Sequence, residues 1–397
     1  MEQYKKFKLK PKKEQSLMRF HPWVFSGAIA LMDENVVEGE IVEVYGHDDT
    51  FLGVGHYQIG SIAVRILSFQ KRDIDTDFFR DRLQEAYNMR CALKLVRNDN
   101  TTYRLVHGEG DMLPGLIVDI YGGLAVVQAH SVGMHVSKEM IAMALKSVLK
   151  DTLHHVYYKS ESTLPFKAPI APEDSFLLGG PDLEKIAIEN NLKFQIDWEK
   201  GQKTGFFVDQ RENRSLLESY SDGRNVLNMF CYTGGFSVYA LRGGAQSVVG
   251  VDSSSKAVML ADENVKLNFG DDPRYSSSSN DAFKYLRDVA KGQYDLIVLD
   301  PPAFAKHRGA VRNALQGYKK LNAAAFEKVA NGGVVFTFSC SQVISREQFR
   351  LVVFSAAAMS GRKVKILAQL SPPADHPINL YHPEGEYLKG LVLYVSD

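Results

Sequence analysis

The sequence has few cysteines, no secretion signal and no long apolar run. Its 397 residues include three cysteines, which cannot form a disulfide framework and lack the paired spacing of zinc ligands. No stretch of eighteen uninterrupted apolar residues is present, so a membrane-spanning helix is not expected. The first residues lack the apolar core of a signal peptide. We therefore expect a cytoplasmic protein with neither a metal site nor a membrane association.

The chain also has no net charge, because 47 Lys and Arg residues balance 47 Asp and Glu residues. This balance gives no overall attraction to nucleic acid, so binding to one would depend on local patches. One such patch lies in residues 1–20, which hold seven basic residues and two acidic ones. On charge alone, a solvated basic terminus is the simpler interpretation.

The composition is that of a globular protein, with 45% apolar and 24% charged residues, and the length suggests two or three domains. Three short β-branched runs between residues 41 and 67 predict a small β-barrel within residues 1–75. Thr76 can then cap a helix, after which turn-punctuated strands and a second helix follow. We expect this α+β domain to span residues 76–180.

The remainder of the chain, 181–397, has the pattern of an α/β domain. A hairpin with arms at 192–197 and 206–209 is expected first. Beyond residue 220, continuous apolar runs alternate with helical patterns, which is typical of a parallel sheet covered by helices on both faces. Residues 276–279 are all serine, and we expect them to form a loop. The apolar runs are 226–227, 247–251, 296–299 and 334–338.

Polar residues follow the ends of several of these strands, which is where open parallel sheets bind ligands. In the first such segment, 230–236, Gly234 and Gly235 let the backbone approach a ligand closely before a helix begins. Tight turns also need glycine for steric reasons, so this signal is weak by itself. The second strand ends at Asp252, whose carboxylate can accept hydrogen bonds from two ribose hydroxyls. A helix-capping role for Asp252 is the weaker alternative, because Ser254 supplies that chemistry.

Asp281 is a further candidate for the cofactor site. It can contact an adenine amino group or cap the next helix, and the sequence favours neither. The first loop lacks the G-x-G-x-x-G spacing that places a pyrophosphate on a helix, and no lysine-bearing phosphate loop is present. Ribose and adenine acceptors without a phosphate cradle fit S-adenosylmethionine better than NAD. We therefore predict an S-adenosylmethionine site at this edge of the sheet.

Two further strand ends carry candidate catalytic residues. The first is Asp300-Pro301-Pro302, whose prolines fix a rigid, extended exit that holds Asp300 beside the cofactor. Such a segment recurs in methyltransferases that act on nitrogenous bases, although it can also be only a stiff loop. The second is Cys340. A cysteine after an apolar strand is usually a small buried hydrophobe, but its convergence with Asp252 and Asp300 favours a role in chemistry.

A nucleophilic thiol has a definite use in methylating carbon 5 of cytosine. That carbon is a poor nucleophile until a thiolate adds to carbon 6 and converts the ring into an enamine-like species. After methylation, a base removes the carbon-5 proton and the thiolate leaves. Asp300 can form a hydrogen bond near ring N3 and stabilise the charge of the adduct. An unperturbed thiol titrates near ~8.5, so this route requires an environment that favours the thiolate.

Several motifs together resemble the RlmI-type 23S rRNA cytosine-5 methyltransferases over nearly the whole chain. The resemblance implies a PUA RNA-binding domain at 1–75, a small central α+β domain at 76–180 and a Rossmann-like class I methyltransferase domain at 181–397. It also implies S-adenosylmethionine as cofactor, 23S rRNA as substrate and a cysteine nucleophile, here Cys340, with Asp300 beside it. The motifs are Arg19–Gly27, Thr204–Arg211, Tyr232–Phe236, Asp300–Pro302, Ser339–Ser341, Asp375–Pro377 and Pro383–Gly385.

Two groups of binding residues follow from this resemblance. The basic terminus becomes an RNA-facing edge, where phosphate contacts give affinity but little sequence information. Trp23 and Phe25 can stack on bases, although core packing is the simpler explanation for both. The predicted RNA contacts are Lys10, Lys12, Lys13, Arg19 and Lys306. The predicted cofactor contacts are Phe230, Tyr232, Thr233, Gly234, Gly235, Asp252, Asp281, Asp300, Pro301 and Gln210.

The sequence departs from the family pattern at two points. A lysine often follows the two prolines in this family, and Ala303 occupies that position here, so the role of the lysine is absent or passes to Lys306. Other RNA cytosine-5 methyltransferases place a second cysteine in this loop to assist product release. This chain has none there, so another base or water must complete the elimination.

Two other functions stay open on the sequence. The same fold can methylate a nitrogen of an RNA base without a thiol, using Asp300 and the proline carbonyls. Alternatively, the chain can be a non-catalytic RNA-binding or ribosome-assembly factor that keeps a methyltransferase shell. An NAD enzyme is disfavoured by the first loop, and a homodimer is compatible with the sequence.

Overall fold

The computed structural model describes residues 4–164 and 173–397. The chain forms two compact units, each built from segments that are distant in sequence. Among the described residues, no helix combines the length and the apolar character needed to cross a membrane. The domain limits expected at residues 75 and 180 stay predictions. The first unit contains 1–191, 196–208 and 374–385, and the second contains 192–195, 209–373 and 386–397.

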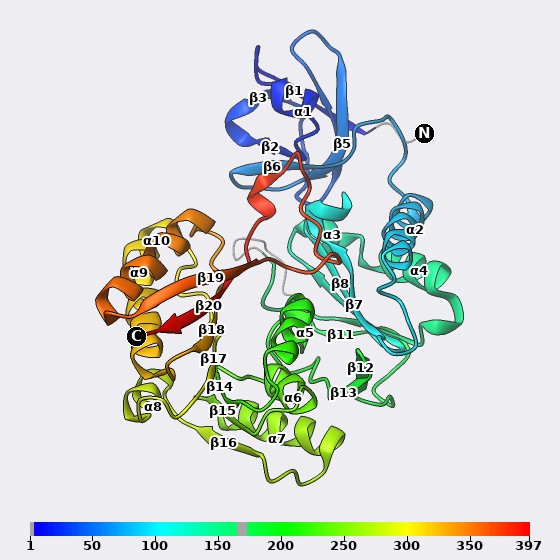
Figure 1. Ribbon diagram of the computed structural model, residues 1–397. Coiled ribbons are helices and arrows are strands. Elements are labelled where there is room, and N and C mark those ends of the chain that lie inside the picture. The colour runs from blue at the N-terminus through cyan, green and yellow to red at the C-terminus, as the bar shows by residue number, and fades with distance from the viewer. Residues whose placement is uncertain (1–3, 165–172) are drawn as a thin grey trace. The chain divides into compact units, whose positions relative to one another are not determined.

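The first unit begins with a six-stranded sheet, which lies within residues 1–75, where the sequence predicts a small β-barrel (Figure 1). Its strand order is β2-β6-β5-β4-β1-β3, and all neighbours are antiparallel except β1 and β4. Alternating apolar side chains such as Phe7, Val44 and Ile66 enter one core. The elements are β1 (Lys5–Leu9), α1 (Gln15–Met18), β2 (Trp23–Phe25), η1 (Ser26–Ala28), β3 (Ile29–Met32), β4 (Ile41–Tyr45), β5 (Phe51–Tyr57) and β6 (Ile62–Ser68).

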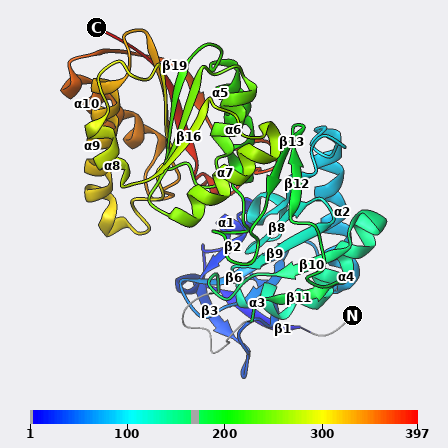
Figure 2. The ribbon, with the colours of Figure 1, turned by 90° about the horizontal axis from the view of Figure 1, so that it is seen from below.

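A five-stranded sheet in the order β11-β10-β9-β8-β7 belongs to the same unit. Helices α2 and α4 pack against it, and their apolar residues, including Leu83 and Leu145, share a core with strand residues such as Leu105 and Val156 (Figure 2). The elements are α2 (Thr76–Ala92), β7 (Thr102–His107), η2 (Gly108–Asp111), β8 (Leu116–Tyr121), β9 (Leu124–Ala129), α3 (Val132–Val136), α4 (Lys138–Leu149), η3 (Lys150–Thr152), β10 (His155–Tyr158), β11 (Ser175–Leu178) and β12 (Ile186–Glu189).

The second unit is a seven-stranded sheet in the order β16-β15-β14-β17-β18-β20-β19. The first five strands are parallel, and β20 pairs antiparallel with both β18 and β19. Helices α5, α6 and α7 lie on one face and α8, α9 and α10 on the other (Figures 1 and 2). This arrangement confirms the predicted α/β fold with a doubly covered, mainly parallel sheet.

The bounds of this unit follow the predicted alternation of strands and helices. The elements are β13 (Leu192–Gln195), η4 (Val208–Gln210), α5 (Arg211–Ser219), β14 (Asn225–Met229), α6 (Gly235–Arg242), β15 (Ser247–Asp252), α7 (Ser255–Phe269), β16 (Tyr275–Ser279), α8 (Ala282–Asp288), β17 (Leu296–Leu299), η5 (Arg308–Ala310), α9 (Val311–Lys328), β18 (Gly333–Ser339), α10 (Arg346–Ser360), β19 (Lys363–Leu370) and β20 (Lys389–Ser396). Between β19 and β20, η6 (Pro383–Gly385) lies in the segment 374–385, which belongs to the first unit.

The serine stretch was expected to be a loop, and this expectation is wrong. Residues 276–279 lie within β16, which pairs in parallel with β15, from Val248 opposite Tyr275 to Asp252 opposite Ser279. β16 is the edge strand, so it gains ladder hydrogen bonds from one neighbour only. Pairing with a neighbour decides strand formation here, against the weak strand preference of the serine side chains.

Two local expectations are also wrong. The N-cap of α2 is Asp75, whose carboxylate accepts a hydrogen bond from the Phe78 amide at 2.8 Å, and Thr76 is already helical. The second arm of the expected hairpin, at 206–209, is not a strand and ends in η4. Gly205 explains this break, because its φ is +110° and a Cβ there would lie 2.8 Å from the backbone of Asp197.

Candidate active site

Four segments singled out in the sequence meet at one edge of the seven-stranded sheet. β14 runs into the loop at 230–234, β15 ends at Asp252, Asp300 directly follows β17, and Cys340 directly follows β18. These four strands are parallel and consecutive neighbours, so their carboxyl ends lie together. In open α/β sheets this edge is where ligands bind.

The loop after β14 is held in an unusual backbone conformation. Phe230 and Tyr232 have φ of 59° and 45°, values that side-chain-bearing residues seldom adopt, and Gly234 has φ of 76°. A Cβ on Gly234 would lie 2.9 Å from the Cβ of Ala261 on α7. This glycine is therefore required by the local packing, independently of any ligand. Gly235 begins α6, and Thr233 is buried within the loop.

Asp252 fixes this loop from the neighbouring strand. Its Oδ2 accepts a hydrogen bond from the Tyr232 amide at 3.0 Å, and its Oδ1 accepts one from the Ser254 amide at 2.9 Å. The N-cap of α7 is Ser254, so the alternative role of Asp252 as that cap is wrong. A carboxylate has about four acceptor positions, so the half-buried Asp252 can still accept bonds from two hydroxyls.

Asp281 has the capping role that the sequence left open. It is the N-cap of α8, and its Oδ1 accepts a hydrogen bond from the Lys284 amide at 2.8 Å. Its side chain is exposed, and an adenine contact for it stays a prediction. The exposed ring of Phe283 stacks on Phe304 in the segment after the two prolines, with ring centroids 6.5 Å apart. An apolar face therefore lies beside Asp281.

Asp300 is the most perturbed carboxyl at this edge. Burial, reinforced by the negative charge of Asp209, raises its pKa from 3.8 to about 7. A hydrogen bond from Gln210 Nε2 to Asp300 Oδ2, at 3.1 Å, and the charge of Arg214 oppose this rise. Gln210 is itself oriented by Asn213, whose amide donates to it at 2.6 Å. At neutral pH the Asp300 carboxyl therefore exists in both protonation states.

Cys340 lies against the segment that carries Asp300. Its thiol donates to the Pro301 carbonyl with a sulfur–oxygen distance of 3.9 Å, and its side chain is half-buried. Cys231, in the glycine loop, is buried instead, and this burial raises the pKa of its thiol strongly. Cys91 is exposed on α2. Of the three cysteines, only Cys340 combines partial exposure with a place beside Asp300.

The structure adds Lys389, which the sequence did not indicate as a site residue. It begins β20, is buried, and donates through Nζ to the carbonyls of Ser341, at 2.7 Å, and Ile344. Burial lowers the pKa of Lys389 to about 8, and the charges of Glu386 and Cys340 oppose that shift. The sequence did contain one signal for this residue, a lysine at the start of an otherwise apolar strand. A lysine that is buried with such a strand needs hydrogen-bond or charge partners.

The predicted RNA contacts are all on the surface. Lys10, Lys12, Lys13 and Arg19 are exposed near α1, and Lys10 Nζ donates to the Gly27 carbonyl at 2.9 Å. Phe25 is 46% exposed, which contradicts core packing as its explanation. Trp23 is half-buried and donates through Nε1 to Glu109 at 2.9 Å. Lys306 is exposed in the segment after Pro302.

Known proteins resemble this chain along its length. Residues 165–377 match the profile of the S-adenosylmethionine-dependent methyltransferase family, and residues 7–69 match that of the PUA-like domain. Ribosomal RNA large subunit methyltransferase I of Aeromonas hydrophila is 40% identical over 387 residues, which cover 96% of this chain and 97% of that protein. The protein of the same name from Alteromonas mediterranea is 39% identical, with 98% of both chains covered.

Solved structures share the fold. A methyltransferase complexed with SAH is 24% identical and has a TM-score of 0.83, covering 98% of this chain and 99% of that one. A SAM-dependent methyltransferase from Streptococcus mutans is 23% identical with a TM-score of 0.82. Because similarity at 39–40% identity runs through both matched domains, the chain belongs to the ribosomal RNA large subunit methyltransferase I family, whose cofactor is S-adenosylmethionine.

Proposed function

We propose that this protein methylates carbon 5 of a cytosine in large-subunit ribosomal RNA, the 23S rRNA, with Cys340 as the nucleophile. The observation that carries the proposal is the position of the Cys340 thiol, half-buried and 3.9 Å from the Pro301 carbonyl, directly beside Asp300. A thiol in contact with the residue that follows Asp300, together with the Asp300 carboxyl that titrates near neutral pH, supplies the two functional groups that carbon-5 chemistry requires.

The proposed reaction forms and breaks one bond to Cys340. The thiolate adds to carbon 6 of the cytosine, which makes carbon 5 electron-rich. When bound, S-adenosylmethionine supplies an electrophilic methyl group to that carbon. The carbon-5 proton then leaves to water or a base, the electron pair re-forms the ring double bond, and the carbon–sulfur bond breaks. The target base must be unpaired and out of its stack to reach the sulfur.

Asp300 acts on the ring nitrogen in this proposal. With a pKa of about 7, its protonated form can donate a hydrogen bond to cytosine N3 as negative charge develops there. The Gln210 amide orients the carboxyl by donating to its other oxygen. The prolines that follow fix the backbone, so the acid and the sulfur keep their relative position during the reaction.

Lys389 is a positioning residue for the nucleophile. Its two carbonyl bonds fix residues 341–344, the turn that directly follows Cys340. The negative charge of Cys340 opposes the lowering of the Lys389 pKa, and the attraction between these two side chains is mutual. We propose that the Lys389 ammonium is the counter-charge that a nucleophilic thiolate needs.

The cofactor site is proposed at the same edge. Asp252 keeps acceptor capacity for ribose hydroxyls, and we assign the adenine to Asp281 and its neighbouring aromatic face. Gln210 and Asp300 then lie near the reacting end. The other proposed contacts are Phe230, Tyr232, Thr233, Gly234, Gly235 and Pro301.

RNA binding is proposed for the PUA-like domain and for Lys306. The exposed cations of the N-terminal segment suit phosphate contacts, and the exposed ring of Phe25 suits stacking on an unpaired base. Division of the chain into domains at 1–75, 76–180 and 181–397 is proposed on the same grounds.

The experiment that tests this function is mass-spectrometric mapping of methylated cytosine in ribosomal RNA. Cells lacking the gene are complemented with the wild type, with Cys340→Ala or with Cys91→Ala as the matched control. We expect one 5-methylcytosine to be absent without the gene, restored by the wild type and by Cys91→Ala, and not restored by Cys340→Ala.

Each alternative function has its own outcome in this experiment. Restoration of a methylated nitrogen by Cys340→Ala would reassign the enzyme to nitrogen methylation. A ribosome defect that is rescued by a variant unable to bind S-adenosylmethionine would favour a non-catalytic assembly factor.

A further inference from the structure

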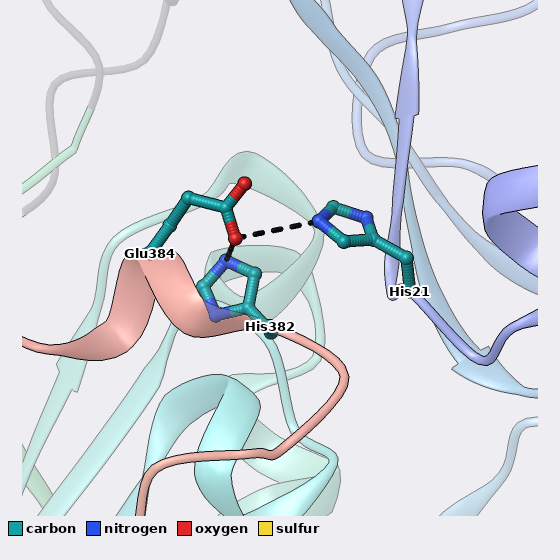
Figure 3. Close-up of side chains that lie close together, drawn as sticks. All are labelled: His21, His382 and Glu384. Atoms are coloured by element: carbon teal, nitrogen blue, oxygen red, sulfur yellow. Dashed lines mark ion pairs between the residues drawn. The ribbon is translucent and has the colours of Figure 1, made fainter.

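We propose that His21, His382 and Glu384 form a binding site for a divalent transition-metal ion such as Zn²⁺. His21 precedes β2, whereas His382 and Glu384 lie at η6, and all three belong to the first unit. Figure 3 shows the two imidazole rings and the carboxylate turned toward one another. One ligand atom from each residue lies within 4.8 Å of the other two. None of these three residues has a role in the proposed methyl-transfer chemistry.

The distances between the donor atoms suit a shared metal ion. His21 Nε2 lies 3.5 Å and His382 Nε2 lies 3.7 Å from Glu384 Oε2. Ligands about 2.0–2.1 Å from a tetrahedral Zn²⁺ stand roughly 3.3–3.4 Å from one another. Both separations are long for hydrogen bonds, and each needs to shorten by only a few tenths of an ångström to match a pair of zinc ligands. The ligand nitrogens of the two histidines lie within 4.8 Å of one another.

His382 gives an independent indication of a ligand. Its side chain is 2% exposed, yet neither ring nitrogen has a hydrogen-bond partner among the described residues. Buried polar atoms are nearly always paired, and leaving one unpaired costs about 1–3 kcal/mol. A metal ion at Nε2 would satisfy the nitrogen that faces Glu384.

Trp23 lies against both histidines of this site. The ring of Trp23 packs on His382 with centroids 4.3 Å apart, and Glu109 accepts a hydrogen bond from the Trp23 indole. The Trp23 amide donates to His21 Nδ1 at 3.2 Å. Ligation through Nε2 moves the imidazole proton to Nδ1, so metal binding must displace this amide. The environment of Trp23 is therefore a direct reporter of ligation.

The donor set selects the class of metal. Two imidazoles and one carboxylate, without thiolate, suit Zn²⁺ and neighbouring first-row ions rather than Mg²⁺ or Ca²⁺, which prefer oxygen ligands. Three protein ligands leave a position for water. The ion would connect the segment before β2 to residues 382–384, which are about 360 positions later in the chain, and closing so long a loop stabilises the fold.

The test is titration of the metal-free, full-length protein with ZnCl₂, followed by calorimetry and by the fluorescence of Trp23 in a Trp198→Phe background. We expect one equivalent to bind with a change in Trp23 emission. Glu384→Gln and His382→Gln should each weaken binding by roughly 100-fold, the upper end of the loss seen even for outer-shell changes. His47→Gln, which removes an exposed histidine of the same unit, should leave binding unchanged.

Several results would overturn the proposal. They are the absence of stoichiometric Zn²⁺ binding, affinity for Zn²⁺ no higher than for Mg²⁺, or equal binding by Glu384→Gln and the wild type. If a variant fails to fold by circular dichroism, X-ray absorption of the zinc-loaded wild type decides instead. Two imidazoles with oxygen ligands support the site, and sulfur in the coordination shell contradicts it. None of these measurements depends on methyl transfer, so they are independent of the proposed function.

Discussion

Each unit of the chain buries a cluster of charged side chains, and the two clusters differ in how completely they are paired. In the first unit, Arg90 donates to both oxygens of Asp111, and Arg104 donates to both oxygens of Asp119. Arg90 also donates to the Asp375 carbonyl at 2.9 Å. Every charge in this cluster faces an opposite charge in bidentate geometry, which is the arrangement that stabilises a buried ion pair.

The charged groups of the second unit are not paired with opposite charges in this way. Burial, reinforced by the negative charge of Asp209, raises the pKa of Asp300 to about 7, and the hydrogen bond from the neutral Gln210 amide opposes this rise only in part. Lys389 is held by carbonyl groups, and burial lowers its pKa to about 8. Groups that titrate near neutral pH can exchange protons during a reaction. The difference separates a cluster that stabilises the fold from one to which we assign the proposed methyl-transfer chemistry.

Removing one charge from the paired cluster tests most strongly whether this cluster stabilises the fold. We expect Arg90→Met to lower the free energy of unfolding by about 3–5 kcal/mol, because Asp111 is left buried without its counter-charge. Urea denaturation measures the loss. Arg80→Met, on the same helix but in a partly exposed ion pair, should cost at most about 1 kcal/mol. Equal losses in both variants would show that the Arg90 cluster is not specially stabilising.

Removing the lysine of the second cluster should affect catalysis more than folding. We expect Lys389→Met to reduce the rate of methyl transfer about 100-fold, or roughly 2.7 kcal/mol, because residues 341–344 lose their anchor and the thiolate loses a counter-charge. In the wild type, loss of the Asp300 proton should lower activity from about pH 7, and deprotonation of the Lys389 ammonium should make this decline steeper above about pH 8. The pH–rate profile of Lys389→Met should keep the first decline and lack the steeper part. Lys365→Met, an exposed lysine on β19, serves as the control.

Replacing the carboxyl of the second cluster should stabilise the protein while inactivating it. The folded-state pKa of Asp300 is about 7 against 3.8 unfolded, so between these values the folded state holds an extra proton. Stability therefore falls as pH rises from about 4 to 7, and the full cost applies above pH 7. We expect Asp300→Asn to raise the free energy of unfolding by about 1–3 kcal/mol at pH 8.

This gain should disappear below about pH 3, where the carboxyl is mostly protonated in both the folded and the unfolded wild type. Thermal unfolding at the two pH values provides the measurement, and Asp288→Asn is an exposed control on α8. A gain that is the same at both pH values would contradict the raised pKa.

The smallest expected effect concerns cofactor affinity. Asp252→Asn keeps one acceptor oxygen but loses the negative charge, so binding of S-adenosylmethionine should weaken about tenfold, or roughly 1.4 kcal/mol. Calorimetry checks this value, with Asp271→Asn as an exposed control. Unchanged affinity would remove Asp252 from the cofactor site.

Much of the second unit could be predicted from the sequence because its strands carry continuous apolar runs. Polar residues that end such strands, including Asp252, Asp300 and Cys340, necessarily share one edge once the strands are parallel. The serine strand β16 could not be predicted in this way, because its pairing with β15 supplies what its side chains lack. Its existence depends on tertiary context.

The parts of the site that the sequence did not reveal depend on long-range contacts. Lys389 follows Cys340 by about fifty residues and reaches residues 341–344 only because β20 pairs antiparallel with β18. Likewise, residues 374–385 belong to the first unit although they are flanked by segments of the second. The local hydrophobic periodicity of a sequence does not show when a distant segment packs back against an earlier unit. The juxtaposition of His21 with His382 was therefore not foreseeable.

The most direct test of the central claim is to trap the covalent intermediate on Cys340. A fragment of the substrate ribosomal RNA that contains 5-fluorocytidine is incubated with the protein and S-adenosylmethionine, because fluorine replaces the proton that elimination removes. We predict a stable one-to-one protein–RNA adduct in the denatured-protein mass spectrum, with the linkage mapped to Cys340. Methylation of the unmodified RNA without any such adduct would contradict the account.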